Sequence, residues 1–264
     1  MSVIAKHQKT LEVLWIGKRI GYGFIPPITS GEEWDFLGSI HATRLTTLAL
    51  NGIQCYGQTL ATLINQCPAL ENVLLWGTPE ISQNVLDALS ALQRLTQLDL
   101  YISNRYALNN DSTDMAAFCR TAPKTTRRLC FRGAGSIGFV TNEVLHSIAK
   151  HMGSFLRDLV LDTSLSNSVK DMAWFFQQLK QLECLELDGV MCLSQPAFES
   201  LGRLQKLMAV RLYLCQSVTN EALDVLITQS HSLRRLGVVY CNLADPERFL
   251  RDAQMVIKHA YVKG

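Results

Sequence analysis

The glycines of Gly133-Ala-Gly135-Ser-Ile-Gly138 have the spacing of a known chemical motif. Glycines arranged in this way between a strand and a helix let the backbone approach a dinucleotide phosphate, and Asp162 lies at the end of the next expected strand, as a ribose-binding acid would. The context argues against this interpretation, because the following helix is expected to begin only after Thr141, too late to direct its N-terminus at a phosphate. The preceding strand also carries three arginines, unlike a strand buried on both faces. A nucleotide-binding enzyme that uses the Gly133–Gly138 loop is kept as a remote alternative.

The remaining polar residues form no pattern typical of catalysis or metal binding. The six histidines lack the spacing of metal ligands, and the eight cysteines include no Cys-x-x-Cys pair. A zinc site needs several such ligands that converge on one point. The sequence also lacks a Gly-x-Ser-x-Gly elbow and a Gly-x-x-x-x-Gly-Lys-Ser/Thr phosphate loop. We therefore expect no catalytic residue, no cofactor and no metal, and a protein that is not an enzyme.

Composition and charge restrict the classes of partner. The 25 Lys and Arg nearly balance the 23 Asp and Glu, so the sequence shows no basic excess of the kind that nucleic-acid binders carry, and no nucleic-acid partner is expected. No apolar run reaches the roughly 20 residues needed to cross a bilayer, so no membrane partner is expected either. The N-terminus does not resemble a secretory signal. These features indicate a cytoplasmic or nuclear protein, or one found in both compartments, with reduced thiols.

A repeated Leu-x-x-Leu-x-Leu pattern organises the chain and must position any functional residue. It occurs nine times, with first positions at Leu11, Leu45, Leu70, Leu95, Thr126, Leu156, Leu182, Leu207 and Leu233. The spacings between these positions are 34, 25, 25, 31, 30, 26, 25 and 26, so five of the eight are 25 or 26. Regular self-similarity of this length is typical of a solenoid built from stacked units.

Each unit combines one short strand with one helix. The last two apolar positions of the pattern are two residues apart, so both point to the same face of a strand. The intervening segments, such as 84–92 and 142–150, place apolar residues at spacings of three and four, which predicts an amphipathic helix. Since neither element can bury its apolar face alone, the sequence predicts an α/β solenoid with one continuous core.

The chain resembles the leucine-rich-repeat family. The best match begins at Leu207-x-x-Val210-x-Leu212-x-x-Cys215, and the copy that begins at Leu233 places Cys241 at the same offset. These two repeats are similar to the cysteine-containing subtype found in F-box ubiquitin-ligase receptors. The resemblance implies a horseshoe-shaped solenoid of about nine repeats, with a parallel concave sheet and convex helices.

The resemblance also implies a function. It indicates a noncatalytic protein-protein recognition module that recognises ubiquitination substrates in an SCF-type ligase. A Skp-type adaptor would be a partner only if an F-box precedes this chain. A structural leucine-rich-repeat scaffold or adaptor unrelated to ubiquitin is the alternative.

We expect residues 1–264 to form one leucine-rich-repeat domain. The segment 246–264 carries an apolar stripe on an otherwise charged helix, so it is expected to cap the C-terminal end of the core. The first repeat begins ten residues into the chain without a polar cap, which leaves open a missing N-terminal segment.

Two surfaces are candidates for binding a protein partner. Strand residues that alternate with the core leucines are expected on the concave face: Trp15, Trp76, Tyr101, Arg128, Arg132, Asp158, Asp162, Glu186, Asp188, Arg211 and Tyr213. The insertions after the first, fourth and fifth strands add edge loops with Tyr22, Phe24, Tyr106 and Phe139. Aromatic residues and arginines are common anchors of protein interfaces. The alternatives are a solvated ladder of ion pairs on the concave face and tolerated length variation in the loops.

Overall fold

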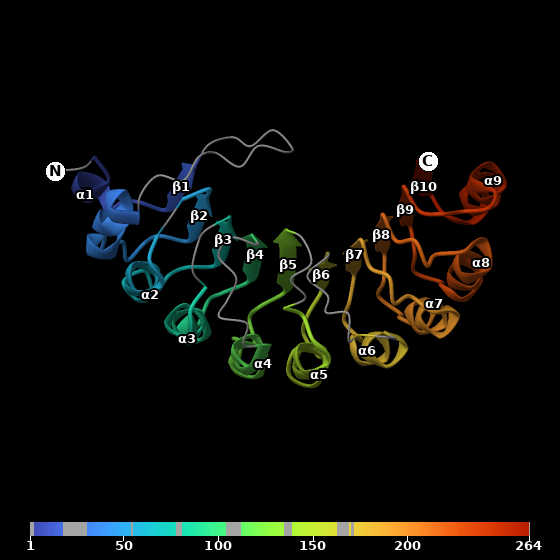
Figure 1. Cartoon of the computed structure of the whole chain (residues 1–264), viewed down its shortest axis with the longest axis horizontal. Helices are drawn as coiled ribbons and strands as arrows, with labels where there is room; N and C mark the ends of the chain where they lie inside the picture. Colours follow the sequence, from blue (N-terminus) through green and yellow to red (C-terminus); the bar gives the residue numbers. More distant parts are fainter. Residues whose placement is uncertain are drawn as a thin grey trace.

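The computed structural model describes residues 3–17, 31–53, 55–77, 81–103, 112–134, 139–162, 169 and 172–263. Its strands form a single sheet in which every strand is parallel to its neighbours and follows them in chain order (Figure 1). The strands are β1 (Val13–Gly17), β2 (Thr47–Asn51), β3 (Asn72–Trp76), β4 (Gln97–Ser103), β5 (Arg128–Ala134), β6 (Asp158–Leu161), β7 (Cys184–Asp188), β8 (Ala209–Tyr213), β9 (Arg235–Val239) and β10 (His259–Lys263).

The helices cover one side of this sheet. They are α1 (Val3–His7), the 3-10 helix η1 (Gly31–Ser39), α2 (Gly57–Asn65), α3 (Gln83–Ala91), α4 (Ser112–Thr121), α5 (Asn142–His151), α6 (Ala173–Gln178), α7 (Gln195–Gly202), α8 (Asn220–Gln229) and α9 (Pro246–Val256). Figure 1 shows the strands along the inner side of an arc and the helices along its outer, convex side. The predicted leucine-rich-repeat solenoid is therefore the fold of the chain.

The repeated leucines set the strand register. In the first strand position of the pattern, Leu98 pairs with Val73 on one side and with Leu129 on the other. All three side chains are buried, as are their counterparts two residues later. Because apolar residues pair with apolar residues from repeat to repeat, the side chains form one core between the sheet and the helices.

The residue that follows a strand closes the turn in a left-handed conformation. Gly52, Gly77 and Gly189 have φ values of 65°, 60° and 66° at this position. The Gly77 N–H donates to the carbonyl of Tyr101 on the next strand at 3.0 Å, and Gly189 makes the same contact with Tyr213 at 2.8 Å. Glycine suits this turn because it has no Cβ to clash at positive φ.

The C-terminal end differs from the sequence prediction. The expected capping helix over 246–264 ends at Val256, and β10 then adds a tenth strand parallel to β9. The signal for this strand is a weak tenth copy of the pattern, Ile257-x-x-Ala260-x-Val262, in which Ala260 replaces a leucine. The repeat number is therefore one higher than nine when strands are counted.

Candidate functional site

The concave face is built from three rows of side chains that run across the sheet. The first row lies two residues before the central row along each strand, and the third row lies two residues after it. The strand pairing fixes the central row, which comprises Trp15, Ala49, Leu74, Asp99, Cys130, Val160, Glu186, Arg211, Gly237 and Tyr261. The middle of this row is buried at Asp99, Cys130 and Val160. Exposed groups of the central row therefore lie toward the two ends of the sheet.

A continuous chain of polar side chains crosses the C-terminal half of the concave face. Arg132 Nη2 lies 2.7 Å from Glu186 Oε1, and Arg211 Nη1 lies 3.1 Å from Glu186 Oε2. Burial lowers the pKa of Arg211, but the nearby Tyr261 hydroxyl and Glu186 carboxylate raise it. We call Arg132, Glu186, Arg211 and Tyr261 the arginine–glutamate chain. It links β5, β7, β8 and β10, and it presents two cations around one shared carboxylate.

The chain crosses two intervening strands, β6 and β9. Val160 stands between Cys130 and Glu186 in the central row, and Arg132 reaches Glu186 across β6. On β9, Gly237 leaves space for Tyr261, because a Cβ built there would lie 2.4 Å from the Tyr261 ring. The Tyr261 ring thus occupies the space above Gly237, and this contact brings its hydroxyl to Arg211.

Two further predicted residues border the chain. Asp188 and Tyr213 are register partners in the third row, one step beyond Glu186 and Arg211. Burial raises the pKa of the Asp188 carboxyl, although Arg132 lowers it. Tyr213 contacts the Tyr240 ring edge-on, with centroids 5.5 Å apart.

The predicted aromatic residues separate into two places. Trp76, Tyr101 and Arg132 are successive register partners in the third row, so the structure brings these three together. Burial raises the pKa of the Tyr101 hydroxyl, and the nearby Asp162 carboxylate adds to the rise. Trp15 is exposed in the central row of the edge strand β1, with all of β2 between it and Trp76.

The acidic residues expected on the concave face do not form one cluster. Asp158 lies in the first row and is the register partner of Arg128 on the neighbouring strand. The ion pair of Arg128 is nevertheless with the buried Asp99 carboxylate, which lies 3.4 Å from the Arg128 Nε. Asp162 is buried, so the expectation that it is exposed on the concave face is wrong. Its Oδ1 accepts a hydrogen bond from the Gly133 N–H at 2.7 Å, which ties the end of β6 to β5.

The edge loops are described only in part. Tyr22, Phe24 and Tyr106 lie outside the described residues, as does the 135–138 part of the glycine-rich loop. The expectation that Phe139 is a surface residue is wrong, because its side chain is buried edge-on against Phe131 with ring centroids 5.9 Å apart. The two groups that a dinucleotide would contact, the Gly133 N–H and the Asp162 carboxylate, bond to each other.

Two residues beside the chain have strained backbone. Leu214 and Tyr240 follow β8 and β9 at the turn position where earlier repeats have glycine, and both have φ of 52°. Their N–H groups make the same turn contacts, at 2.9 Å to Val239 and 2.7 Å to Lys263. The Leu214 side chain remains 42% exposed and that of Tyr240 37% exposed, although the Tyr240 ring also contacts Tyr213 and lies 5.3 Å from Lys263 Nζ.

Sequence reasoning missed Tyr261, Leu214 and Tyr240. Tyr261 could have been found from the weak tenth repeat that begins at Ile257. The two turn residues could have been found by aligning the copies, since the equivalent positions hold Gly52, Gly77 and Gly189.

Over the described ranges, no helix is long and apolar enough to span a membrane. The same residues contain no group of three or more His, Cys, Asp or Glu side chains that could hold a metal ion.

No protein-family model and no curated protein match the chain. Among solved structures, it is similar to a chain in the crystal structure of the Rad7 and Elc1 complex in yeast, with a TM-score of 0.46 and 14% identity. The similarity covers 87% of this chain and 71% of that chain. The fold assignment therefore rests on the repeat pattern and the strand order of the sheet.

Proposed function

We propose that the chain is a noncatalytic protein-recognition module that binds its partner at the C-terminal half of the concave face. The binding surface comprises the arginine–glutamate chain together with Tyr213, Leu214 and Tyr240. The aromatic row of Trp76 and Tyr101 extends it toward the N-terminal half.

The strained turns at Leu214 and Tyr240 carry this proposal. A non-glycine residue in the left-handed region costs about 1–2 kcal/mol. The fold does not require this cost, because Gly52, Gly77 and Gly189 make the same turn without it. Non-glycine residues in such conformations cluster at functional sites, where the surrounding structure maintains them. Large exposed side chains kept at two adjacent strained turns are therefore best explained by contact with a partner.

The chemistry of the neighbouring residues fits protein recognition. Tyrosine and arginine are enriched among residues that dominate interface energetics, and both occur here on rigid strands. The ion pairs hold Arg132 and Arg211 in fixed positions, which lowers the entropy lost when a partner binds.

The experiment compares proteins captured by the wild-type chain with those captured by Leu214→Gly/Tyr240→Gly. Glycine relieves strain at both turns, so the variant should remain folded while losing its exposed side chains. Trp174→Ala is the matched control, because it removes an exposed aromatic residue from α6 on the convex side.

Quantitative mass spectrometry of affinity-purified samples should show specific partners with the wild type and with Trp174→Ala, and at least about tenfold less with the double variant, as hot-spot loss predicts. Equal recovery with the double variant would contradict the proposed surface.

We further propose that this recognition serves an SCF-type ubiquitin ligase. The support is the pair of repeats that resemble the cysteine-containing subtype. The Cys215 thiol donates to the Leu187 carbonyl at 3.5 Å, and the Cys241 thiol makes the equivalent contact with Leu212 at 3.8 Å. The two cysteines therefore play the same structural part in successive repeats.

Purification of the native full-length product tests the ligase assignment. Recovery of a Skp-type adaptor and a cullin, with the other captured proteins ubiquitinated, would support it. Recovery of partners without these components would favour a leucine-rich-repeat scaffold or adaptor unrelated to ubiquitin.

A further inference from the structure

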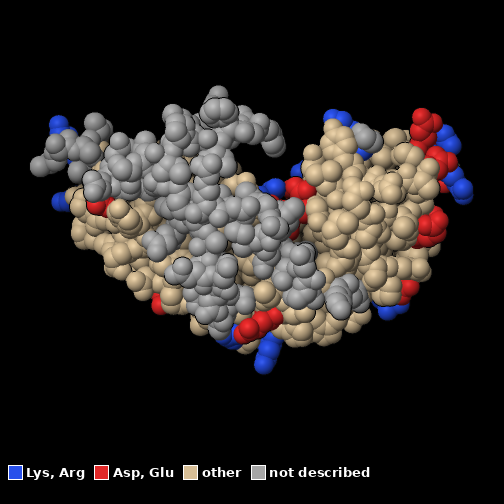
Figure 2. Space-filling model, in the orientation of Figure 1, with Lys and Arg blue, Asp and Glu red and all other residues tan. Residues whose placement is uncertain are grey.

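Among the described residues, Lys and Arg gather at one edge of the solenoid. The segments that join each helix to the next strand contain eleven Lys and Arg but three Glu. These segments are 8–12, 40–46, 66–71, 92–96, 122–127, 152–157, 179–183, 203–208, 230–234 and 257–258. On the opposite edge, the described residues between strands and helices contain two Asp and no Lys or Arg. On the face shown in Figure 2, the described C-terminal half is largely uncharged, with both Lys and Arg and Asp and Glu at its rim. A net charge of +2 therefore conceals a strongly basic edge.

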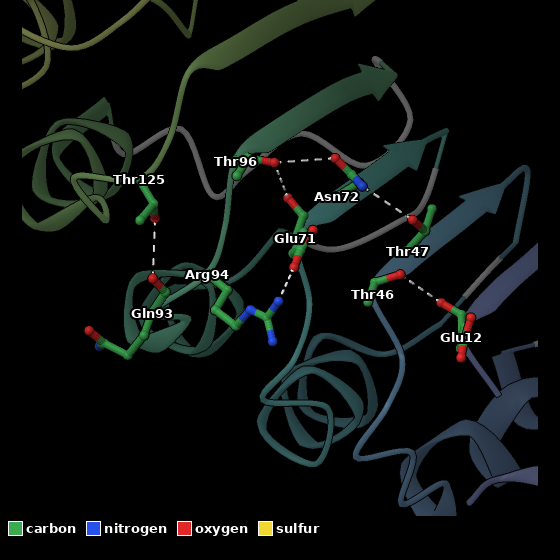
Figure 3. A network of polar contacts seen from close by, with 9 residues as sticks. All are labelled: Glu12, Thr46, Thr47, Glu71, Asn72, Gln93, Arg94, Thr96 and Thr125. Carbon is green, nitrogen blue, oxygen red and sulfur yellow. Dashed lines mark hydrogen bonds and ion pairs between the residues drawn. The ribbon is translucent and has the colours of Figure 1, made fainter. Parts of the chain in front are cut away.

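This edge already binds carboxylates within the chain. Arg94 Nη2 pairs with Glu71 Oε1 of the preceding repeat at 2.5 Å, as Figure 3 shows. Arg44 pairs with Glu12 in the same way at 2.8 Å. In a third pair, Arg157 Nη1 lies 3.5 Å from Glu183 Oε1. The carboxylate in each pair comes from the residue immediately before a strand.

Among the ten described strands, a glutamate immediately precedes β1, β3 and β7, whereas the last three repeats carry cations on this edge without a carboxylate of their own. The position immediately before the strand, which holds Glu12, Glu71 and Glu183 in earlier repeats, is taken by Met208, Arg234 and Lys258 in the last three. The N–H groups of Met208 and Arg234 bond to the carbonyl of the equivalent residue in the preceding repeat, which confirms the alignment. We call Lys206, Arg234, Arg235 and Lys258 the C-terminal basic edge. Each of these residues is exposed, and within the described part of the chain none of the four forms an ion pair.

Helix dipoles do not account for this cluster. Cations in the last turn of a helix stabilise its C-terminus, but the effect falls off beyond that turn. Arg234 and Arg235 lie several residues past the end of α8 at Gln229, and Lys206 likewise lies past the end of α7 at Gly202. The cations are instead held at the start of the strands, on backbone fixed by the sheet.

The composition of the edge favours a protein ligand over nucleic acid. Single-stranded nucleic acid is usually bound through aromatic residues on which bases stack. Among the helix-to-strand segments, Phe155 is the one Phe, Tyr or Trp residue, and it is half-buried beneath the Arg127 guanidinium at 5.7 Å. The pairs on the earlier repeats show that the same edge positions Arg for carboxylate, which arginine recognises with its planar fork.

We propose that the C-terminal basic edge binds an acidic segment of a polypeptide, whose Asp and Glu side chains supply the carboxylates missing from the last three repeats. The neighbouring strands are about 4.8 Å apart, so an extended segment of a few residues spans the cluster. This surface lies at the edge of the sheet where strands begin, away from the strained turns where they end, and the inference does not depend on the concave-face proposal.

Fluorescence anisotropy with a labelled oligoglutamate tests this site on the full chain. The edge variant is Arg234→Gln/Arg235→Gln/Lys258→Gln. A control variant with the same net charge, Arg120→Gln/Arg248→Gln/Arg251→Gln, removes three exposed cations from helices. Circular dichroism checks that both variants are folded, and a labelled DNA duplex is the second probe.

We expect the wild type to bind oligoglutamate, the edge variant to lose about tenfold or more in affinity, and the control to stay within about twofold, as the loss of three exposed ion pairs predicts. Binding should weaken as salt is raised. If the edge variant does not fold, Lys206→Gln/Lys258→Gln should give a smaller loss in the same direction. Equal losses in edge and control variants, binding of DNA without oligoglutamate, or no binding by the wild type would each overturn the proposal.

Discussion

Glu186→Gln is the most informative substitution within the arginine–glutamate chain. It keeps the shape of the side chain and removes the charge that Arg132 and Arg211 share. The side chain of Glu186 is 24% exposed, that of Arg132 is 33% exposed and that of Arg211 is 57% exposed. The two pairs share one carboxylate but differ in solvent screening, so they should differ in strength.

The magnitude follows from these exposures. Exposed pairs contribute about 0–1 kcal/mol, and breaking a fully buried pair costs about 3–5 kcal/mol. The pair with Arg132 lies between these limits, at about 1–2 kcal/mol, while the pair with Arg211 should contribute less than about 1 kcal/mol. Glu186→Gln should therefore lower the free energy of unfolding by about 2 kcal/mol, or the melting temperature by roughly 5 °C.

Urea denaturation of two double-mutant cycles measures both pairs. The cycles combine Glu186→Gln with Arg132→Gln or with Arg211→Gln. The control is Glu199→Gln, which removes a surface partner of Arg203 and should change stability by less than about 0.5 kcal/mol. Equal coupling energies in the two cycles, or a coupling to Arg132 below about 0.3 kcal/mol, would refute the argument from burial.

Three other predictions concern buried or strained groups. Burial raises the pKa of the Asp99 carboxyl above its ordinary 3.8, although Arg128 lowers it. Between these two pKa values the folded state holds a proton that the unfolded state releases. The free energy of unfolding should therefore fall as the pH rises from 3.8 through the raised pKa. Asp99→Asn should remove this part of the pH dependence of the free energy of unfolding, measured by urea titration at several pH values. Wild-type and Asp99→Asn curves that stay parallel across this pH range would contradict the prediction. Gly77→Ala should lower the stability measured in thermal melts by about 1–2 kcal/mol, because Gly77 has a φ of 60°. Steric clash is not the cause, since the nearest atoms to a new Cβ lie 3.9 Å away. The control is Gly38→Ala, which has no positive φ and should not destabilise the fold. The neighbouring Cys215 thiol lowers the pKa of Cys241 below its ordinary value, so iodoacetamide should modify Cys241 first. Its rate should rise at a lower pH than the rates of the other thiols and should shift upward in Cys215→Ala; modification no faster than at the other thiols would contradict this.

The repeat architecture could be predicted from the sequence because the leucine spacing determines both strand and helix. The pattern places Leu98 and Leu129 in the core of neighbouring strands, and the pairing confirms it. The tenth strand was missed because Ala260 weakens the pattern just where the expected helix ends. Local periodicity was thus sufficient wherever the leucines were present.

The binding face could be predicted only in outline. Alternation along a strand identifies the concave side, but it does not say which side chains are buried there or what they contact. The Asp162 carboxylate accepts a hydrogen bond from the Gly133 N–H of the neighbouring strand β5, 29 positions away in sequence. The Arg132–Glu186 pair joins residues 54 positions apart across an intervening strand. Such contacts join residues far apart in the chain, which no local pattern shows.

Net charge was similarly uninformative about surfaces. The near balance of 25 cations and 23 acids predicts no charged patch, yet the repeats place most loop cations on one edge. The segregation becomes visible once each loop is assigned to an edge of the sheet.

Oxidative footprinting of the chain with its captured partner tests the central claim most directly. Tyr213, Tyr240 and Tyr261 lie on or beside the arginine–glutamate chain, whereas the exposed Trp174 lies on convex helix α6. The account predicts that the partner protects the three tyrosines from oxidation and leaves Trp174 as reactive as in the free chain. Protection of Trp174 with unchanged tyrosines would contradict recognition by the concave face.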